Sequence, residues 1–281
     1  MSKTIAELLE LPPHKEPYKS KTADIISCPD PGLLYGVELE LENTHQEDWN
    51  TTAFYSTSDG SLRNDGWEYI SRPMDYSNLV HSINYFYSRW GITSDNISER
   101  CSVHVHVNCH DITEEQLTSL CLLYQTFEGL LFNWAGPHRY DNVFCVPWSQ
   151  TNITFNSANL IIARGIKDIP LWEKYTALNL TPLHTLGTVE FRHMPGTEDP
   201  ERIFIWLRII GSMFAYIKKH DYKSIRRKFV ALNSNSAYKN ILEDVFQMEA
   251  PTLMTPDYKT TLEQGVLDIK YMLINNLKKS K

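Results

Sequence analysis

No stretch of this 281-residue chain is apolar over the length of a membrane-spanning helix, and its first residues lack the apolar core of a signal peptide. Positive charge is also scarce, because 27 lysines and arginines stand against 34 aspartates and glutamates. The resulting net charge of −7 argues against a membrane surface or a nucleic-acid scaffold as the main partner. We therefore expect a cytoplasmic protein in which local arginine, lysine or metal ions bind any negatively charged substrate.

Cysteine is sparse as well. The five cysteines are odd in number and include no C-x-x-C spacing. This usage is typical of buried thiols in a reducing compartment rather than of a disulfide framework. Cys145 lies in an expected loop, where a nucleophile is one interpretation, but we favour a buried thiol there too.

The composition is that of a folded globular protein, with 42% hydrophobic and 22% charged residues. This length can bury one large core or two modest ones. We find no internal repeat and no clear linker, and we expect a single α+β domain. Its expected parts are an extended lead-in over residues 1–30, the main domain over 31–220, and a helical extension over 221–281 that packs on the same domain.

Hydrophobic periodicity predicts most of the elements. Thr113 and Gln116 form a plausible capping box, and Asp199 followed by Pro200 is a strong helix start. The polar stretch after Glu42 is interpreted as a local insertion, and residues 149–171 give no clear pattern. The expected strands are 33–41, 67–71, 102–108, 175–180 and a further one around Glu190, and the expected helices are 75–90, 113–131 and 199–219.

Three of these strands carry polar side chains at a spacing of two. Because successive side chains on a strand point to opposite faces, each set shares one face, opposite an apolar one. Taken singly, each set is typical of the wet face of a sheet or of an exposed ion pair. Together they indicate crowded carboxylates of the kind that divalent cations neutralise. The sets are Glu38, Glu40 and Glu42; His104, His106 and Asn108; and Thr188, Glu190 and Arg192.

The order of these motifs resembles the amidoligase family, the carboxylate–amine ligases common in phages and bacterial gene clusters. That family is related in fold to glutamine synthetase and glutamate–cysteine ligase. The resemblance covers roughly residues 32–220 and rests on ordered blocks. The blocks are Gly36-Val37-Glu38-Leu39-Glu40, Asp59-Gly60-Ser61-Leu62, Glu68 with Ser71 and Pro73, His104-Val105-His106-Val107-Asn108, Arg139 with Asn142, Lys174-Tyr175 with Asn179, Thr188-Val189-Glu190-Phe191-Arg192, and Gly196-Thr197.

The resemblance implies a curved antiparallel sheet with flanking helices that binds ATP with Mg²⁺ or Mn²⁺ and joins an acid to an amine through an acyl phosphate. For a phage-encoded protein the compartment would be the bacterial host cytoplasm. Oxygen ligands suit Mg²⁺, and a histidine ligand makes Mn²⁺ an equally good fit. The roles implied by position are one ion held by Glu38, His104 and Glu190, a second ion held by Glu40 and Glu68, and nucleotide contacts from His106, Arg192 and Asn179, with Arg192 on the γ-phosphoryl group.

Other positions carry two interpretations. Asp59 lies in a turn, which it either caps or from which it orients and deprotonates the attacking amine. Arg139 lies in an irregular loop, as a solvated surface arginine or as a catalytic clamp on a substrate carboxylate or phosphate. For Asn179, packing and hydrogen bonding within the sheet is the alternative to a nucleotide contact, and we favour it for Tyr175. His193 faces the apolar side and is expected to be a core histidine.

Several alternatives remain open. A related fold could serve a kinase of a guanidino or carboxylate group, or a catalytically degenerate protein that only binds a ligand. Metal-dependent hydrolysis with zinc on His104 and His106 is a further alternative, although no third histidine or cysteine lies at ligand spacing. The expected partners are a small-molecule acid and amine. The identity of both, an ammonia-supplying or pathway partner protein, and the oligomeric state are not specified by the sequence.

Overall fold

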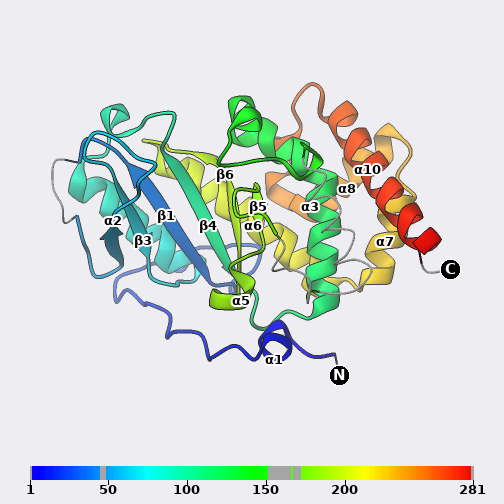
Figure 1. The fold of residues 1–281 in the computed structure, drawn as a ribbon, viewed down its shortest axis with the longest axis horizontal. Helices are drawn as coiled ribbons and strands as arrows, with labels where there is room; N and C mark the ends of the chain where they lie inside the picture. The colour runs from blue at the N-terminus through cyan, green and yellow to red at the C-terminus, as the bar shows by residue number, and fades with distance from the viewer. Residues whose placement is uncertain (1, 45–48, 151–165, 167–171, 280–281) are drawn as a thin grey trace.

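The computed structural model describes residues 2–44, 49–150, 166 and 172–279 (Figure 1). The strands are β1 (Tyr35–Leu41), β2 (Phe54–Thr57), β3 (Trp67–Ser71), β4 (Ser102–Asn108), β5 (Leu178–Asn179) and β6 (Thr188–Pro195). The α-helices are α1 (Ile5–Leu9), α2 (Tyr76–Trp90), α3 (Glu114–Ala135), α5 (Leu183–Leu186), α6 (Pro200–Lys219), α7 (Tyr222–Val230), α8 (Asn235–Phe246), α9 (Ala250–Leu253) and α10 (Tyr258–Lys279). Short 3-10 segments are η1 (Ser94–Asn96), η2 (Pro137–Asp141), η3 (Trp148–Gln150) and η5 (Gln247–Glu249).

One antiparallel sheet organises the described part of the chain. Its six strands follow the order β2-β3-β1-β4-β6-β5, and each pairing is antiparallel. The motif-bearing strands β1, β4 and β6 are therefore neighbours at its centre (Figure 1). The predicted α+β class with an antiparallel sheet is confirmed.

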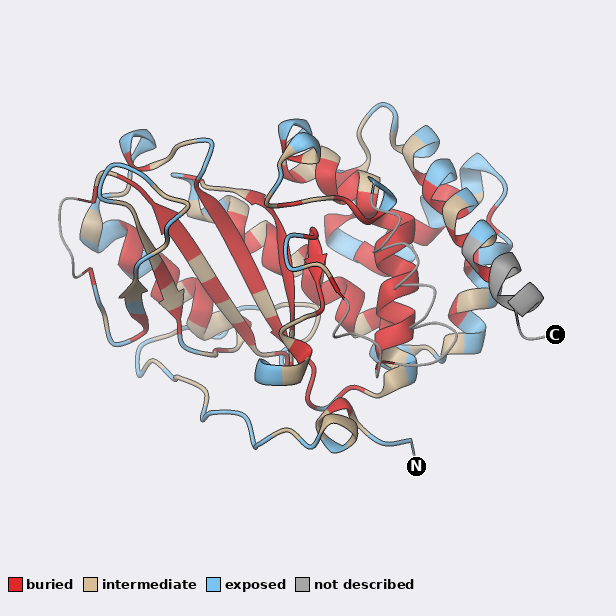
Figure 2. Cartoon of the chain, viewed as in Figure 1, coloured by how far each residue is buried: buried red, intermediate tan, exposed pale blue. Residues whose placement is uncertain are grey.

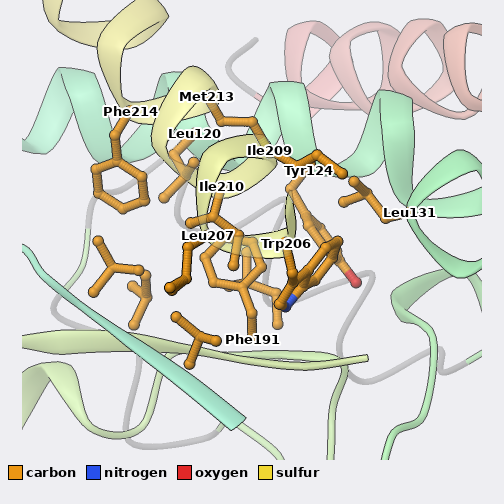
Figure 3. Close-up of a cluster of buried hydrophobic side chains, with 14 of the residues drawn as sticks. Leu120, Tyr124, Leu131, Phe191, Trp206, Leu207, Ile209, Ile210, Met213 and Phe214 are labelled. Carbon is orange, nitrogen blue, oxygen red and sulfur yellow. The ribbon is translucent and has the colours of Figure 1, made fainter. Parts of the chain in front are cut away.

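The apolar face of this sheet packs on helices. Val37 and Val105 are fully buried there, and the Tyr35 hydroxyl of β1 donates to the Leu207 carbonyl of α6 at 3.5 Å. Figure 3 shows how α3, α6 and Phe191 of β6 share one buried cluster. A fully buried side chain of this size contributes about 1.5–3 kcal/mol, so this cluster fixes the position of the strands.

The two long central helices begin where the sequence predicts. At α3 the Gln116 amide donates to Thr113 Oγ1 at 3.3 Å, and the Thr113 amide donates to Gln116 Oε1 at 2.8 Å. At α6 the carboxylate of Asp199 accepts from the Glu201 amide at 3.0 Å. Both caps satisfy amides that the first helical turn leaves without partners. Burial along α3 and α6 is nearly continuous (Figure 2).

Three elements differ from the expectation. The lead-in contains α1, whose buried Ile5 donates its amide to the Ile112 carbonyl at 2.8 Å; a helix this short depends on such docking rather than on its own propensity. The strand expected over 175–180 is only the two residues of β5. The edge strand β2 was not predicted, because Phe54 is its one buried residue and leaves no alternation to detect.

The chain beyond residue 220 is helical in its described part, and α10 lies against α3. Their backbones approach closely where Gly265 faces Thr126: a Cβ at Gly265 would lie 2.1 Å from the Thr126 carbonyl oxygen. The polar region after Glu42 partly lies outside the described residues, as does most of 149–171. None of the described helices is both long and hydrophobic enough to cross a membrane.

Substitution of Gly265 by alanine tests the close approach of α10 to α3. We expect Gly265→Ala to lower the free energy of unfolding by roughly 1–3 kcal/mol, because a helix backbone cannot yield to the added methyl group. Urea denaturation measures the change. The exposed Glu263→Ala in the same helix is the control and should stay within about 0.5 kcal/mol of the parent. Equal stability of both variants would contradict this packing.

Candidate functional site

The register of the sheet brings the predicted polar residues side by side. On the strands, directly opposed residues have side chains on the same face and close together. The side chains of the opposed residues given below therefore form one continuous polar surface across β3, β1, β4, β6 and β5. Glu42 and Asn108, although predicted on the same faces, are not among the described residues that line the cavity at this surface. The opposed pairs are Glu38 with His104, Glu40 with Glu68, His106 with Glu190, and Asn179 with Glu190.

This polar surface lines a cavity of about 480 Å³. The lining combines five carboxylates with two histidines and three permanent cations, and the rest is polar or aromatic except Pro182 and Leu186. Such convergence of ionisable groups in a concave site is typical of binding and catalysis. The ionisable lining residues are Glu38, Glu40, Asp59, Glu68, Glu190, His104, His106, Arg100, Lys174 and Arg192, with Tyr175, Asn179 and Ser102 among the others.

One group of possible metal ligands consists of Glu38, His106 and Glu190. One ligand atom from each lies within 4.8 Å of the other two. His106 Nε2 is 3.1 Å from Glu38 Oε1 and 4.0 Å from Glu190 Oε1. The other ring nitrogen, Nδ1, is hydrogen-bonded to Thr188 Oγ1 at 2.9 Å. This bond orients the ring so that Nε2 faces the two carboxylates.

A second group consists of Glu40, Asp59 and Glu68, which also offer ligand atoms within 4.8 Å of one another. Asp59 Oδ1 accepts the Ser61 amide at 2.7 Å, as the turn-capping interpretation predicts, and the residue also lines the cavity. The sequence predicted Glu40 and Glu68 as the ligands of one ion. The structure adds Asp59 as a third carboxylate beside them.

His104 lies between the two groups. Its Nδ1 is 3.1 Å from Glu38 Oε2 and 3.5 Å from Glu190 Oε1, and its Nε2 is 3.7 Å from Glu40 Oε1. The ring is only 2% exposed, and Nε2 has no hydrogen-bond partner among the described residues. The predicted set of Glu38, His104 and Glu190 therefore lies together, and the geometry adds His106 as a second histidine beside the same two carboxylates.

The carboxylates perturb one another strongly. Burial, followed by the charges of Glu38 and Glu40, raises the pKa of Glu68 to about 8, and burial also raises the pKa of Glu40. For Glu38 burial acts in the same direction, but hydrogen bonds with His104 and His106 outweigh it and lower the pKa. The full set of negative charges is therefore costly without added positive charge.

Arg192 and Asn179 hold Glu190 in place. Arg192 Nη1 donates to Glu190 Oε1 in a close ion pair, and Asn179 Nδ2 donates to Glu190 Oε2 at 2.7 Å. Arg192 Nε donates to the Phe144 carbonyl at 3.0 Å. Both carboxylate oxygens are thus oriented toward the cavity. Asn179, predicted as a nucleotide contact, already uses its amide group to orient this carboxylate.

A β-bulge lies opposite His104. The pairing of β4 with β6 shifts between Val103 and Val105, so His104 faces two residues of β6, Arg192 and His193. Ordinary strand alternation places Arg192 on the cavity side with Glu190 and His193 in the core, where its Nε2 meets the Tyr124 hydroxyl at 3.0 Å. The expectation of a core histidine is confirmed.

Arg139 stabilises this bulge by hydrogen bonds to its main-chain carbonyls. It is 1% exposed, its Nε donates to the His193 carbonyl at 3.0 Å, and its Nη2 donates to the Arg192 carbonyl at 3.0 Å and to Ser102 Oγ at 3.1 Å. It is not one of the described residues that line the cavity. The predicted substrate clamp therefore finds no support here, and a surface arginine is also wrong. No sequence pattern identifies a loop residue whose side chain turns inward to bind strand carbonyls.

Tyr175 and two cations are placed where the sequence did not predict them. Tyr175 is 46% exposed, so its expected packing within the sheet is wrong. Its ring centroid is 5.6 Å from Lys174 Nζ and 5.9 Å from the Arg192 guanidinium carbon. Arg100 precedes β4 and donates to the Ser61 carbonyl at 2.9 Å.

Cys145 is buried, which raises the pKa of its thiol to about 12 and opposes a nucleophilic role.

Comparisons with known proteins add no identification. No protein-family model matches the chain, and no curated protein matches it. The function of this protein must therefore be inferred from the cavity and from the order of the motifs.

Replacement of Arg139 by lysine tests its role at the bulge. We expect Arg139→Lys to lower the free energy of unfolding by roughly 1–3 kcal/mol, because an ammonium cannot reproduce the planar fork that serves two carbonyls. Urea denaturation measures the loss. Arg227→Lys, at an exposed position on α7, should remain within about 0.5 kcal/mol of the parent. An unchanged free energy of unfolding in Arg139→Lys would exclude this structural role.

Replacement of Glu68 by glutamine tests the charge crowding. The pKa of Glu68 in the folded protein is about 8, above its ordinary value of 4.5. Ionisation of Glu68 therefore disfavours the folded state, so the contribution to the free energy of unfolding that is present at low pH is lost as the pH rises through about 8. In EDTA, Glu68→Gln should therefore have a higher Tm than the parent at pH 8–9 and an equal Tm near pH 4.5. Exposed Glu99→Gln is the control. A difference that does not change with pH would contradict the assignment.

Proposed function

We propose that this protein is an ATP-dependent carboxylate–amine ligase with a sheet of the amidoligase type, which forms an amide through an acyl phosphate. One observation carries the proposal. Two neighbouring groups of three metal-ligating residues, Glu38, His106 and Glu190 with Glu40, Asp59 and Glu68, line one cavity beside Arg192. Two divalent ions and a guanidinium are the usual means of balancing a transferring phosphoryl group.

The donor atoms of the cavity fit divalent cations. The two groups contain five carboxylates and one imidazole, and an oxygen-rich set suits Mg²⁺ or Mn²⁺ better than Zn²⁺. The buried His104 Nε2 without a hydrogen-bond partner is a further available donor. In this proposal one ion is held by Glu38, Glu190 and a histidine, and another by Glu40 and Glu68. When bound, the ions neutralise phosphate oxygens and lower the repulsion among the carboxylates.

The cavity also supplies the charge that phosphoryl transfer to a carboxylate requires. Both reactants are anionic, so their approach is slow without neutralisation. Arg192 presents a fixed planar cation, and Lys174 adds a second positive charge in the same lining. In the first step a carboxylate oxygen bonds to the γ-phosphorus while the bond to ADP breaks. These two side chains are assigned to the phosphoryl oxygens.

In the second step the amine nitrogen bonds to the acyl carbon, phosphate leaves, and the nitrogen loses a proton. Asp59 is the group that we assign to orient the amine and accept this proton, because it belongs to the carboxylate group that does not contain Glu190, the partner of Arg192, and is anchored by the Ser61 amide. A zinc hydrolase is less well supported, because each ligand group contains at most one histidine.

Nucleotide binding tests the proposal without knowledge of the acid or the amine. We expect isothermal calorimetry to detect a non-hydrolysable ATP analogue only in the presence of Mg²⁺ or Mn²⁺. Glu190→Gln should weaken this binding at least about 10-fold, since even outer-shell partners of metal ligands cost 10–100-fold. Exposed Glu263→Gln is the matched control. Absence of binding to the parent with either metal would contradict both a ligase and a kinase.

The products distinguish a ligase from the remaining phosphotransfer alternative. Acid–amine pairs are screened for ADP release after nucleotide binding has been established. A ligase releases ADP and free phosphate only when the amine is present. A stable phosphorylated product formed without an amine would identify a kinase instead, and nucleotide binding with no turnover would indicate a degenerate relative.

A further inference from the structure

A second polar cavity lies between α3 and α10, on the side of α3 that faces the C-terminal helices. Its volume is about 640 Å³. Gly129 and Gly265 are in its lining, and at these two positions the helices pack too closely to admit a Cβ. Among the polar residues that line the cavity are Gln125, Glu128, Asp257, Gln264 and Asp268.

This cavity is lined by hydrogen-bond acceptors. It contains three carboxylates, and among the described residues no lysine, arginine or histidine lines it. Gln125 is 2% exposed, and its Oε1 has no hydrogen-bond partner among the described residues. A buried acceptor without a donor costs free energy. The cavity therefore presents an unused acceptor and negative charge to whatever enters it.

Glu128 is held rigidly at the inner end. Its Oε1 accepts the Trp148 amide at 2.6 Å and the Tyr124 hydroxyl at 2.9 Å, and its Oε2 accepts the Ser149 amide at 3.1 Å. On α10, Asp268 accepts from Gln264 Nε2 at 2.9 Å. These two carboxylates thus belong to separate helices, Glu128 to α3 and Asp268 to α10.

The spacing of these carboxylates distinguishes between cations. Within the described residues, no three ligand atoms of this cavity lie close enough together to form a metal group like the two in the main site. A compact metal ion needs such convergence, whereas an elongated organic cation does not. We propose that this cavity binds an alkyl diamine, with one ammonium group near Glu128 and Gln125 and the other near Asp268. This inference does not depend on the proposed ligase activity.

Calorimetry with 1,4-diaminobutane on the full-length protein, in EDTA, tests the site. We expect saturable binding, and at least about 10-fold weaker binding of the uncharged 1,4-butanediol, because charge-assisted hydrogen bonds are worth about that factor or more. Asp268→Asn and Gln125→Leu should each weaken diamine binding, by about 10-fold for Asp268→Asn. Circular dichroism confirms that both variants are folded. Glu190→Gln should bind the diamine like the parent.

Other results would overturn the inference. These are no diamine binding to the parent, equal binding of the diol, or unchanged affinity in both Asp268→Asn and Gln125→Leu. Loss of diamine binding in Glu190→Gln would assign the diamine to the main cavity instead. Because nucleotide binding is measured separately, either proposal can fail while the other stands.

Discussion

Repulsion among the carboxylates of the main cavity is the constraint on which the rest of the polar face depends. Five carboxylates line that cavity, and the sheet holds their strands at fixed separations, so they cannot move apart. The structure compensates locally. His104 and His106 stabilise the charge of Glu38, and Arg192 pairs with Glu190. Glu68 forms no ion pair within the described part of the chain, and burial and the neighbouring carboxylates raise its pKa to about 8.

This arrangement requires a rigid support, which the opposite face supplies. The core of α3, α6 and the apolar strand residues is buried almost completely. Fixed strands turn a cross-strand register into a fixed set of ligand distances, as functional sites need. The hydrogen bonds of Thr188 to His106 and of Asn179 to Glu190 then orient individual side chains.

Much of this could be predicted from the sequence, because it follows from local pattern. Alternation gave the bounds of β3 and β4 as observed, and the Thr113 and Asp199 caps gave the starts of α3 and α6. The convergence of the three motif strands on one cavity follows from their sharing one polar face. The edge strand β2 was missed because tertiary contacts rather than its own sequence determine it. Helix α1 was missed although Thr4 and Glu7 form a capping box at its start.

The details of the site depend on non-local geometry and were not predictable. Arg139 comes from a loop and acts on main-chain carbonyls, which carry no sequence information. The presence of both histidines beside Glu38 and Glu190 depends on the twist and register of the sheet. Tyr175 is exposed because β5 ends the sheet after two residues, so the expected strand neighbours are absent.

The bulge opposite His104 also determines how this protein tolerates length changes. Arg192 and His193 alternate between the cavity and the core as strand residues do, and the pairings on the two sides of the bulge, Phe191 with Val105 and Met194 with Val103, coexist only because one extra residue is accommodated. Deleting a residue there would exchange the faces of one half of β6 relative to the other. We therefore expect insertions and deletions in β6 to destabilise the fold far more than substitutions do, and changes in chain length to be tolerated in loops rather than in this strand.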